Sequence, residues 1–202
     1  MTTRAETGQS AQVDQPDPVY GAGATGPEKN LARVAGVTGA VLTVGSVGVA
    51  APDAWTWWQY AVAAVLAFDL IGGVVANGLN SAKRDHFAAP GPAAGWLGRL
   101  VRRPVLFAAV HIQPILIGLL FPGAAWWWGA AWYLIALLTV ALVRVTPLYL
   151  QRPVALFCCT VVAVLAPLSA APFGLWWVPV IMVLKLTLAH AVQEEPYRPE
   201  GR

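Results

Sequence analysis

The stretch over residues 57–79, WWQYAVAAVLAFDLIGGVVANGL, decides the fold, because Asp69 is the only charged residue in it. About 20 such residues, rising about 1.5 Å each in a helix, cross the hydrocarbon core of a bilayer, which is about 30 Å thick. Tryptophans at its beginning suit the headgroup level. The stretch therefore predicts a helix that crosses a membrane.

The composition of the whole chain supports this interpretation. Hydrophobic residues make up 57% of the 202 residues and charged residues 11%, whereas an ordinary soluble domain is about 25% charged. The net charge of +3 is concentrated in short segments, so it indicates membrane topology and no nucleic-acid partner. We expect an all-α, polytopic integral membrane bundle whose main partner is the lipid bilayer.

Six apolar segments predict about six transmembrane helices, of which the third and fifth are the shortest. They cover residues 34–51, 57–79, 104–121, 126–145, 153–169 and 175–192. The rest of the chain is expected to form a disordered cytosolic tail over residues 1–30 and a short C-terminal tail over 196–202, which leaves 31–195 as the transmembrane domain.

The loops alternate in charge. Those after the first, third and fifth segments contain no Lys or Arg, whereas the long loop after the second holds five basic residues: Lys83, Arg84, Arg99, Arg102 and Arg103. The positive-inside rule then predicts a multi-pass protein of the cell membrane with both termini in the cytoplasm. Nine of the ten tryptophans fall at the opposite, outer ends of the segments, which favours an aromatic belt over a ring that binds a cation.

Charged residues within a membrane span are costly, so they indicate function by default. Asp69, His111 and Lys185 lie in the cytosolic half of the predicted bundle. Lys185 is expected either to snorkel inward or to neutralise Asp69. The alternative is that all three only hold helices together, although polar contacts within membranes contribute about 0.6 kcal/mol on average.

Two segments place polar residues near these charges. On a continuous helix, Asp69, Gly73, Ala76 and Asn80 form one stripe with Asn77 on its flank. In the third segment, Pro114 predicts a kink and a freed carbonyl near His111, and Gln113 is expected to point elsewhere.

The sixth segment ends with His190 and Glu194, four residues apart. They could pair with each other or bind a metal, but a single His-x-x-x-Glu is too common to predict a metal site. A haem held by His111 and His190 is disfavoured, because the two differ by about 7 Å in expected depth. No cofactor follows from the sequence.

The polar residues favour a membrane-embedded enzyme that acts by acid/base chemistry on a lipid or isoprenoid-like substrate reached from the cytosolic leaflet. Asp69 is the expected proton donor, and His111 is expected to be its partner or a base. The expected catalytic residues are Asp69, His111, Asn77, Asn80, His190 and Glu194, and the expected substrate-binding residues are Arg84, His86, Lys185 and Arg198. A small-molecule transporter and a non-catalytic subunit of a membrane complex are the alternatives, whereas a static pore would need polar lining across both leaflets.

Overall fold

The computed structural model describes residues 17–87, 95–123 and 125–194, and every regular element in them is helical. Four helices there are long and apolar enough to cross a membrane: α1 (Gly26–Ala50), α2 (Trp57–Gly78), α7 (Trp126–Val145), and α8 (Leu148–Leu165), which the turn η2 (Ala166–Leu168) extends. Two further apolar stretches, Pro104–Leu120 and Val178–Ala191, are shorter. The predicted all-α fold class is confirmed.

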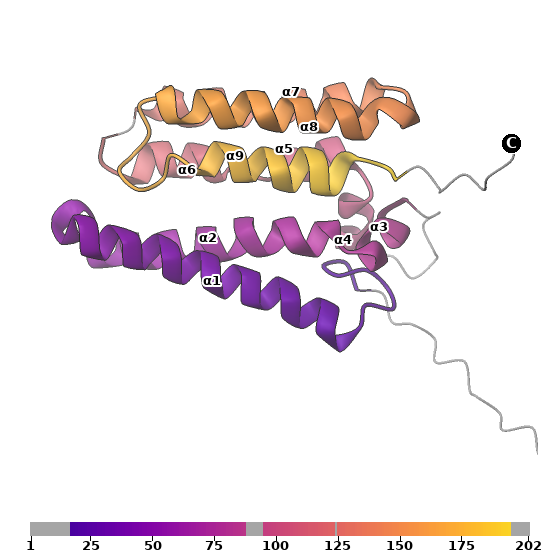
Figure 1. The fold of residues 1–202 in the computed structure, drawn as a ribbon, viewed down its shortest axis with the longest axis horizontal. Coiled ribbons are helices and arrows are strands. Elements are labelled where there is room, and N and C mark those ends of the chain that lie inside the picture. Colours follow the sequence, from indigo (N-terminus) through magenta and orange to yellow (C-terminus); the bar gives the residue numbers. More distant parts are fainter. Residues whose placement is uncertain (1–16, 88–94, 124, 195–202) are drawn as a thin grey trace, which may run out of the picture.

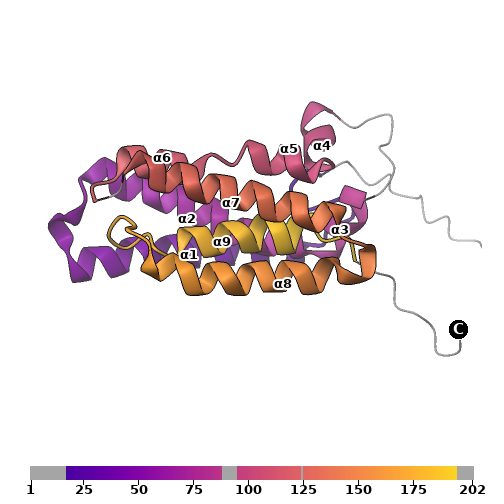
Figure 2. The same ribbon diagram turned by 90° about the horizontal axis from the view of Figure 1, so that it is seen from above.

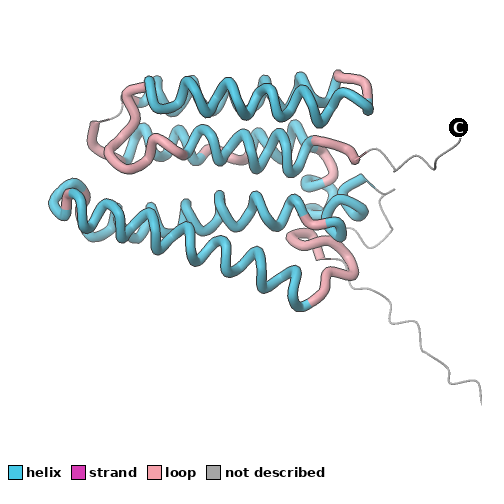
Figure 3. Tube along the Cα trace, in the orientation of Figure 1, coloured by secondary structure: helices cyan, strands magenta, loops and turns pink. Residues whose placement is uncertain are grey.

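The helices lie side by side in three layers (Figures 1 and 2), and no strand separates them in the part of the chain described (Figure 3). Helices α1 and α2 form one layer, and α7 and α8 form the opposite one. Between them lie α5 (Pro104–Ala109), α6 (Gln113–Leu120), α9 (Val178–Val183) and its continuation η3 (Leu184–Ala191). The small helices α3 (Asn80–Phe87) and α4 (Trp96–Val101) sit at the end of the bundle where the described chain begins and ends.

Helix α1 begins at Gly26, earlier than the predicted residue 34, because a capping box fixes its start. The Glu28 amide donates to Thr25 Oγ1 at 3.4 Å, and the Thr25 amide donates to the Glu28 carboxylate at 2.8 Å. Residues 17–25, part of the predicted tail, are packed against the bundle, so the tail prediction is wrong there. Residues 1–16 and 195–202, which include Arg198, lie outside the described residues.

Glycines let α1 and α2 pack closely. A Cβ atom on Gly72 would lie 3.1 Å from the Ala32 carbonyl oxygen and 3.1 Å from the Gly36 Cα atom. A Cβ atom on Gly36 would lie 2.8 Å from the Phe68 ring. The two backbones therefore approach each other closely just beside Asp69.

One helix ends within one residue of its predicted end, and the third segment breaks where the sequence suggested continuity. Helix α2 ends at Gly78, and the extended Leu79 (ψ 141°) separates it from α3, so Asn80 leaves the predicted stripe. The third segment breaks between α5 and α6, where Pro114 has no amide hydrogen to donate. Tyr133 Oη donates to the Ala109 carbonyl at 2.8 Å and satisfies a group that the break frees. The predicted kink is therefore present as a full interruption.

The tryptophans divide between surface and core. Trp57, Trp126 and Trp176 are more than half exposed, as a belt requires, but Trp55 and Trp128 are buried. Trp128 Nε1 donates to Ser169 Oγ at 3.1 Å within the core. The belt interpretation is therefore wrong for the buried members, whose indoles fill the space between helices, and stays a prediction for the exposed ones.

Candidate functional site

Asp69 and Lys185 form an ion pair between α2 and η3. Lys185 Nζ lies 2.9 and 2.8 Å from the two Asp69 carboxylate oxygens, and 3.2 Å from the Asp69 carbonyl oxygen. The Lys185 side chain is 3% exposed, whereas that of Asp69 is 46% exposed. The expectation that Lys185 neutralises Asp69 is confirmed, and snorkelling is not observed.

Gly73 makes room for this pair. A Cβ atom at this position would lie 2.4 Å from Lys185 Cε and 2.8 Å from Nζ. The adjacent Gly72 faces α1 instead. One of the two neighbouring glycines therefore makes room for the backbone of α1, and the other makes room for the Lys185 side chain. Any larger residue at position 73 would have to displace the lysine from the carboxylate.

Gln113 is the third polar member of the site and was missed by the sequence analysis. Its Nε2 atom donates to Asp69 Oδ2 at 3.0 Å. The prediction that Gln113 points elsewhere assumed one continuous helix through residues 104–121. Because the chain breaks after Ala109 and restarts at Gln113, that residue faces α2.

The exposed side of Asp69 faces a cleft of about 100 Å³ between α1, α2 and the segment that precedes α1. Its lining residues are Val19, Tyr20, Ala32, Arg33, Phe68, Asp69, Gly72, Gly73 and Ala76. The Arg33 guanidinium lies 6.0 Å from the centre of the Tyr20 ring, within the range of a cation–π contact. Val19, Tyr20 and Arg33 were therefore missed as site residues, although the Thr25-x-x-Glu28 signature could have revealed the early start of α1.

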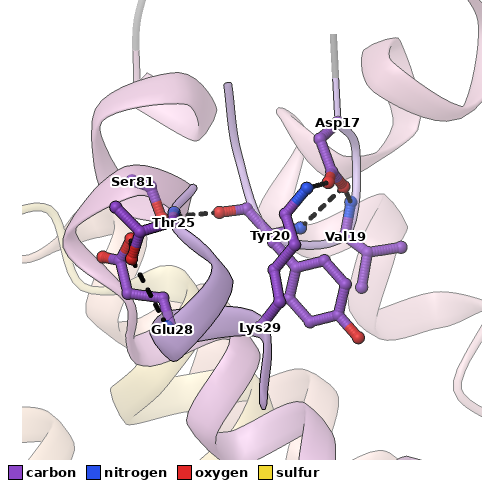
Figure 4. Close-up of polar contacts among 7 residues, drawn as sticks. All are labelled: Asp17, Val19, Tyr20, Thr25, Glu28, Lys29 and Ser81. Carbon is purple, nitrogen blue, oxygen red and sulfur yellow. Dashed lines mark hydrogen bonds and ion pairs between the residues drawn. The ribbon is translucent and has the colours of Figure 1, made fainter. Parts of the chain in front are cut away.

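Polar contacts hold the segment over this cleft (Figure 4). The Asp17 carboxylate accepts from the amides of Val19 and Tyr20 and pairs with Lys29 at 2.9 Å. The Tyr20 carbonyl oxygen accepts from Ser81 Oγ at 2.7 Å. Tyr20 is thus linked to α1 through Asp17 and Lys29, and to α3 through Ser81.

Next to Gly21 the segment touches α3 directly. A Cβ atom on Gly21 would lie 2.3 Å from the Ser81 backbone, and its φ of +80° is one that residues other than glycine rarely adopt. The close approach and the backbone conformation therefore both require glycine at this position.

His111 does not contact Asp69 as predicted. It is 7% exposed, its Nδ1 atom lies 2.6 Å from the Phe107 carbonyl oxygen, and its ring packs on the Phe107 ring at 4.4 Å. The carbonyl that Pro114 frees is that of Val110, which accepts from the Ile112 amide at 3.1 Å, so the His111 ring binds a different carbonyl from the predicted one. Gln113 takes the place beside Asp69 that was predicted for His111.

The three histidines of the chain form one cluster, in which His111 and His190 contact Phe107 and His86 contacts His190. The His190 ring stacks on Phe107 at 4.1 Å and lies 4.8 Å from the His86 ring. Both His111 and His190 contact this one phenyl ring, so their expected difference in depth does not hold them apart. Burial lowers the pKa of His86 to about 4, so this ring is neutral at physiological pH and is a poor ligand for an anion.

The predicted pairing of His190 with Glu194 is wrong. Glu194 instead forms an ion pair with Arg152 of α8. The helix η3 ends at Ala191, and the extended backbone of Val192 (ψ 121°) leads the chain away from it. Neither ring nitrogen of His86 or of His190 has a hydrogen-bond partner among the described residues. Those residues hold no group of three or more His, Cys, Asp or Glu side chains arranged to bind a metal.

The remaining predicted residues lie away from Asp69. Asn77 is 5% exposed, and its amide nitrogen has no hydrogen-bond partner in the described part of the chain. Asn80, Arg84 and Glu194 line a separate groove at the end of the bundle. The predicted residues thus divide among the Asp69 site, the histidine cluster and this groove.

The ionisable residues discussed above lie towards one end of the molecule. Two hollows of about 550 and 390 Å³ meet at Ser46, Gly174 and Trp176, and no ionisable residue lines either of them. Comparison with known protein families, with curated proteins and with solved structures finds no match for this chain. A functional conclusion therefore depends on the geometry around Asp69.

Proposed function

We propose that this protein crosses the cell membrane six times, with both termini in the cytoplasm. The two shorter apolar helices lie between the four long ones (Figure 1), where neighbouring helices can satisfy the backbone groups that the breaks free. The basic residues Lys83, Arg84 and Arg103 belong to the end where the described chain begins and ends, which supports a cytoplasmic location for that end.

Cysteine labelling tests this topology. In a background with Cys158→Ala and Cys159→Ala, we expect Asp53→Cys to react with a membrane-impermeant maleimide in intact cells. Arg103→Cys should react only after the cells are opened. Labelling of Arg103→Cys in intact cells would contradict the topology.

The site supports an enzyme that performs acid/base chemistry on a lipid or isoprenoid-like substrate. The observation that carries this proposal is a carboxylate that is salt-bridged to a buried lysine and still half exposed to a cleft. Because Lys185 Nζ contacts both carboxylate oxygens of Asp69, the roles that we propose differ from the sequence prediction. Asp69 accepts a proton from the substrate, and Lys185 with Gln113 orients the carboxylate and stabilises its charge.

The size of the cleft limits what can enter it. About 100 Å³ admits only the reacting end of a substrate, so the apolar body would remain in the bilayer beside Phe68, which is 45% exposed. An anionic end could approach Arg33 at the mouth of the cleft. This arrangement suits a lipid whose reacting group lies near its polar end.

Lipid extracts from cells test the proposal. Asp69→Asn removes the base, but it also leaves Lys185 buried without its partner, so the double variant Asp69→Asn/Lys185→Met provides a neutral, foldable alternative. We expect one lipid or isoprenoid species to accumulate in both strains. Asp53→Asn, the same change in the exposed turn η1 (Pro52–Ala54), is the control and should resemble the wild type. Unchanged profiles from correctly folded variants would contradict the enzyme proposal.

A further inference from the structure

A second polar hollow lies at the same end of the molecule. This groove, of about 370 Å³, is lined by Asn80, Lys83, Arg84, Phe87, Gln193 and Glu194. It shares no lining residue with the Asp69 cleft. Its walls are α3 and the chain that follows η3, two segments more than a hundred residues apart in sequence that Lys83 joins by donating to the Val192 carbonyl at 2.6 Å.

The groove carries an excess of positive charge. Its one carboxylate, Glu194, already pairs with Arg152. In the part of the chain that is described, no carboxylate lies within ion-pair distance of Lys83 or Arg84. Lys83 is only 8% exposed, and burial lowers its pKa to about 8, although the nearby charge of Glu194 acts in the opposite direction. Because Glu194 is shared with Arg152, the nearly buried Lys83 remains costly, and an anion bound beside it would offset that cost.

Capping of η3 explains part of the placement of these basic residues. Lys83 and Arg144 donate to the carbonyls of Val192 and Ala191 at 2.6 and 3.3 Å, so both cations cap the end of η3. This capping hydrogen bond uses only one of the three ammonium hydrogens of Lys83. It does not involve Arg84, which lines the groove without making any of these contacts.

The donors that remain suit a phosphate group. An ammonium, a guanidinium and the side-chain amides of Asn80 and Gln193 can together surround several oxygens of one anion. Phe87 forms an apolar part of the wall, and Lys83 and Arg144 lie 5.9 and 5.4 Å from its ring centre. Pockets for organic ligands begin at about 300 Å³, so the groove is large enough for a headgroup.

We propose that this groove binds the phosphate of an anionic phospholipid of the cytosolic leaflet, with Arg84 and Lys83 as its main ligands. The inference uses the topology proposed above, in which this end of the bundle faces the cytoplasm. It does not depend on the chemistry at Asp69. Basic pockets beside membrane helices on the cytoplasmic side are known to recognise such headgroups.

Native mass spectrometry of the full-length protein tests the proposal, with phosphatidylglycerol and phosphatidylcholine as competing probes. We expect the wild type to retain phosphatidylglycerol preferentially. Arg84→Gln should weaken this retention about fivefold, the effect of one basic residue near a membrane surface. Arg103→Gln, the same loss of charge at an exposed position outside the groove, should change it less than twofold.

Three outcomes would overturn the proposal. Equal losses in the two variants would indicate diffuse attraction to basic residues, and equal retention of both lipids would exclude recognition of the anionic headgroup. Binding of inorganic phosphate without any preference between the lipids would assign the groove to a free anion. Arg84→Gln leaves Asp69 and Lys185 in place, so it tests headgroup binding without removing the proposed base. Failure of this inference and failure of the enzyme proposal are therefore distinguished by the lipid profile of this variant in cells.

Discussion

Lys185 Nζ lies 2.8 Å from Asp69 Oδ2, yet the lysine side chain is 3% exposed and the aspartate side chain 46% exposed. The pair is therefore asymmetric. Removing the aspartate leaves a buried cation without a partner, whereas removing the lysine leaves a carboxylate that faces an open cleft.

The two single variants should consequently differ in stability. Asp69→Asn is expected to lower the free energy of unfolding by about 3 kcal/mol, and Lys185→Met by clearly less. The double variant should return towards the wild type, because it leaves no unpaired charge. Denaturant titration in detergent measures all three, and equal losses in the two single variants would contradict the asymmetry.

Gly73→Ala tests the space that Lys185 occupies. The added methyl would lie 2.4 Å from Lys185 Cε, so the lysine has to move and the ion pair has to weaken. We expect a loss of about 1–2 kcal/mol in unfolding free energy, together with the lipid accumulation seen for Asp69→Asn. Gly78→Ala on the same helix is the matched control, since a Cβ atom there meets nothing within 4 Å. Identical behaviour of the two variants would count against the close contact.

The buried His86 predicts a dependence of stability on pH. Its pKa is lowered from 6.5 to about 4 in the folded protein, chiefly because burial disfavours the charged form. The unfolded chain therefore binds this proton more readily, and stability falls as the pH drops from about 6.5 towards 4. The contribution at pH 5 is about 2 kcal/mol.

His86→Phe should remove this part of the fall. Thermal melts of the wild type and the variant at pH 7 and pH 5 provide the comparison, because titration of carboxylates affects both proteins alike. If the two proteins lose the same stability between these pH values, His86 is not buried in its neutral form.

Tyr133→Phe tests the break between α5 and α6. The variant leaves the Ala109 carbonyl without the hydrogen bond it accepts at 2.8 Å, which should cost about 1–2 kcal/mol. Tyr149→Phe is the control, because Tyr149 is 62% exposed and should tolerate the change. A neutral Tyr133→Phe would mean that the freed carbonyl needs no partner.

Much of the fold follows from hydrophobicity alone. The uncharged stretches around Asp69 and His111 predict the helices, and the intramembrane charges leave two alternatives for Lys185, of which the contact with Asp69 is the one observed. Hydrophobicity does not determine where a helix breaks. The interruption before Gln113 involves Pro114 and the hydrogen bond from Tyr133 to the Ala109 carbonyl, and it decides which side chain of the third segment faces Asp69.

The mouth of the site was harder to predict for a different reason. Val19 and Tyr20 lie in a polar stretch that cannot bury enough surface to fold by itself, and only contacts with Lys29 and Ser81 order it. These contacts join residues that are distant in the sequence. Similarly, the histidine cluster depends on the position of α3, which carries His86 and lies beyond the predicted second segment.

The most direct test of the proposed enzyme is native mass spectrometry of the wild type, Asp69→Asn and Asp53→Asn purified from the same cells. An enzyme that uses Asp69 as its base should release its product, whereas Asp69→Asn should retain the unconverted substrate. We therefore predict a lipid-like molecule at higher occupancy on Asp69→Asn than on the other two proteins. Equal occupancy on all three folded proteins, or none on any of them, would contradict a catalytic role for Asp69.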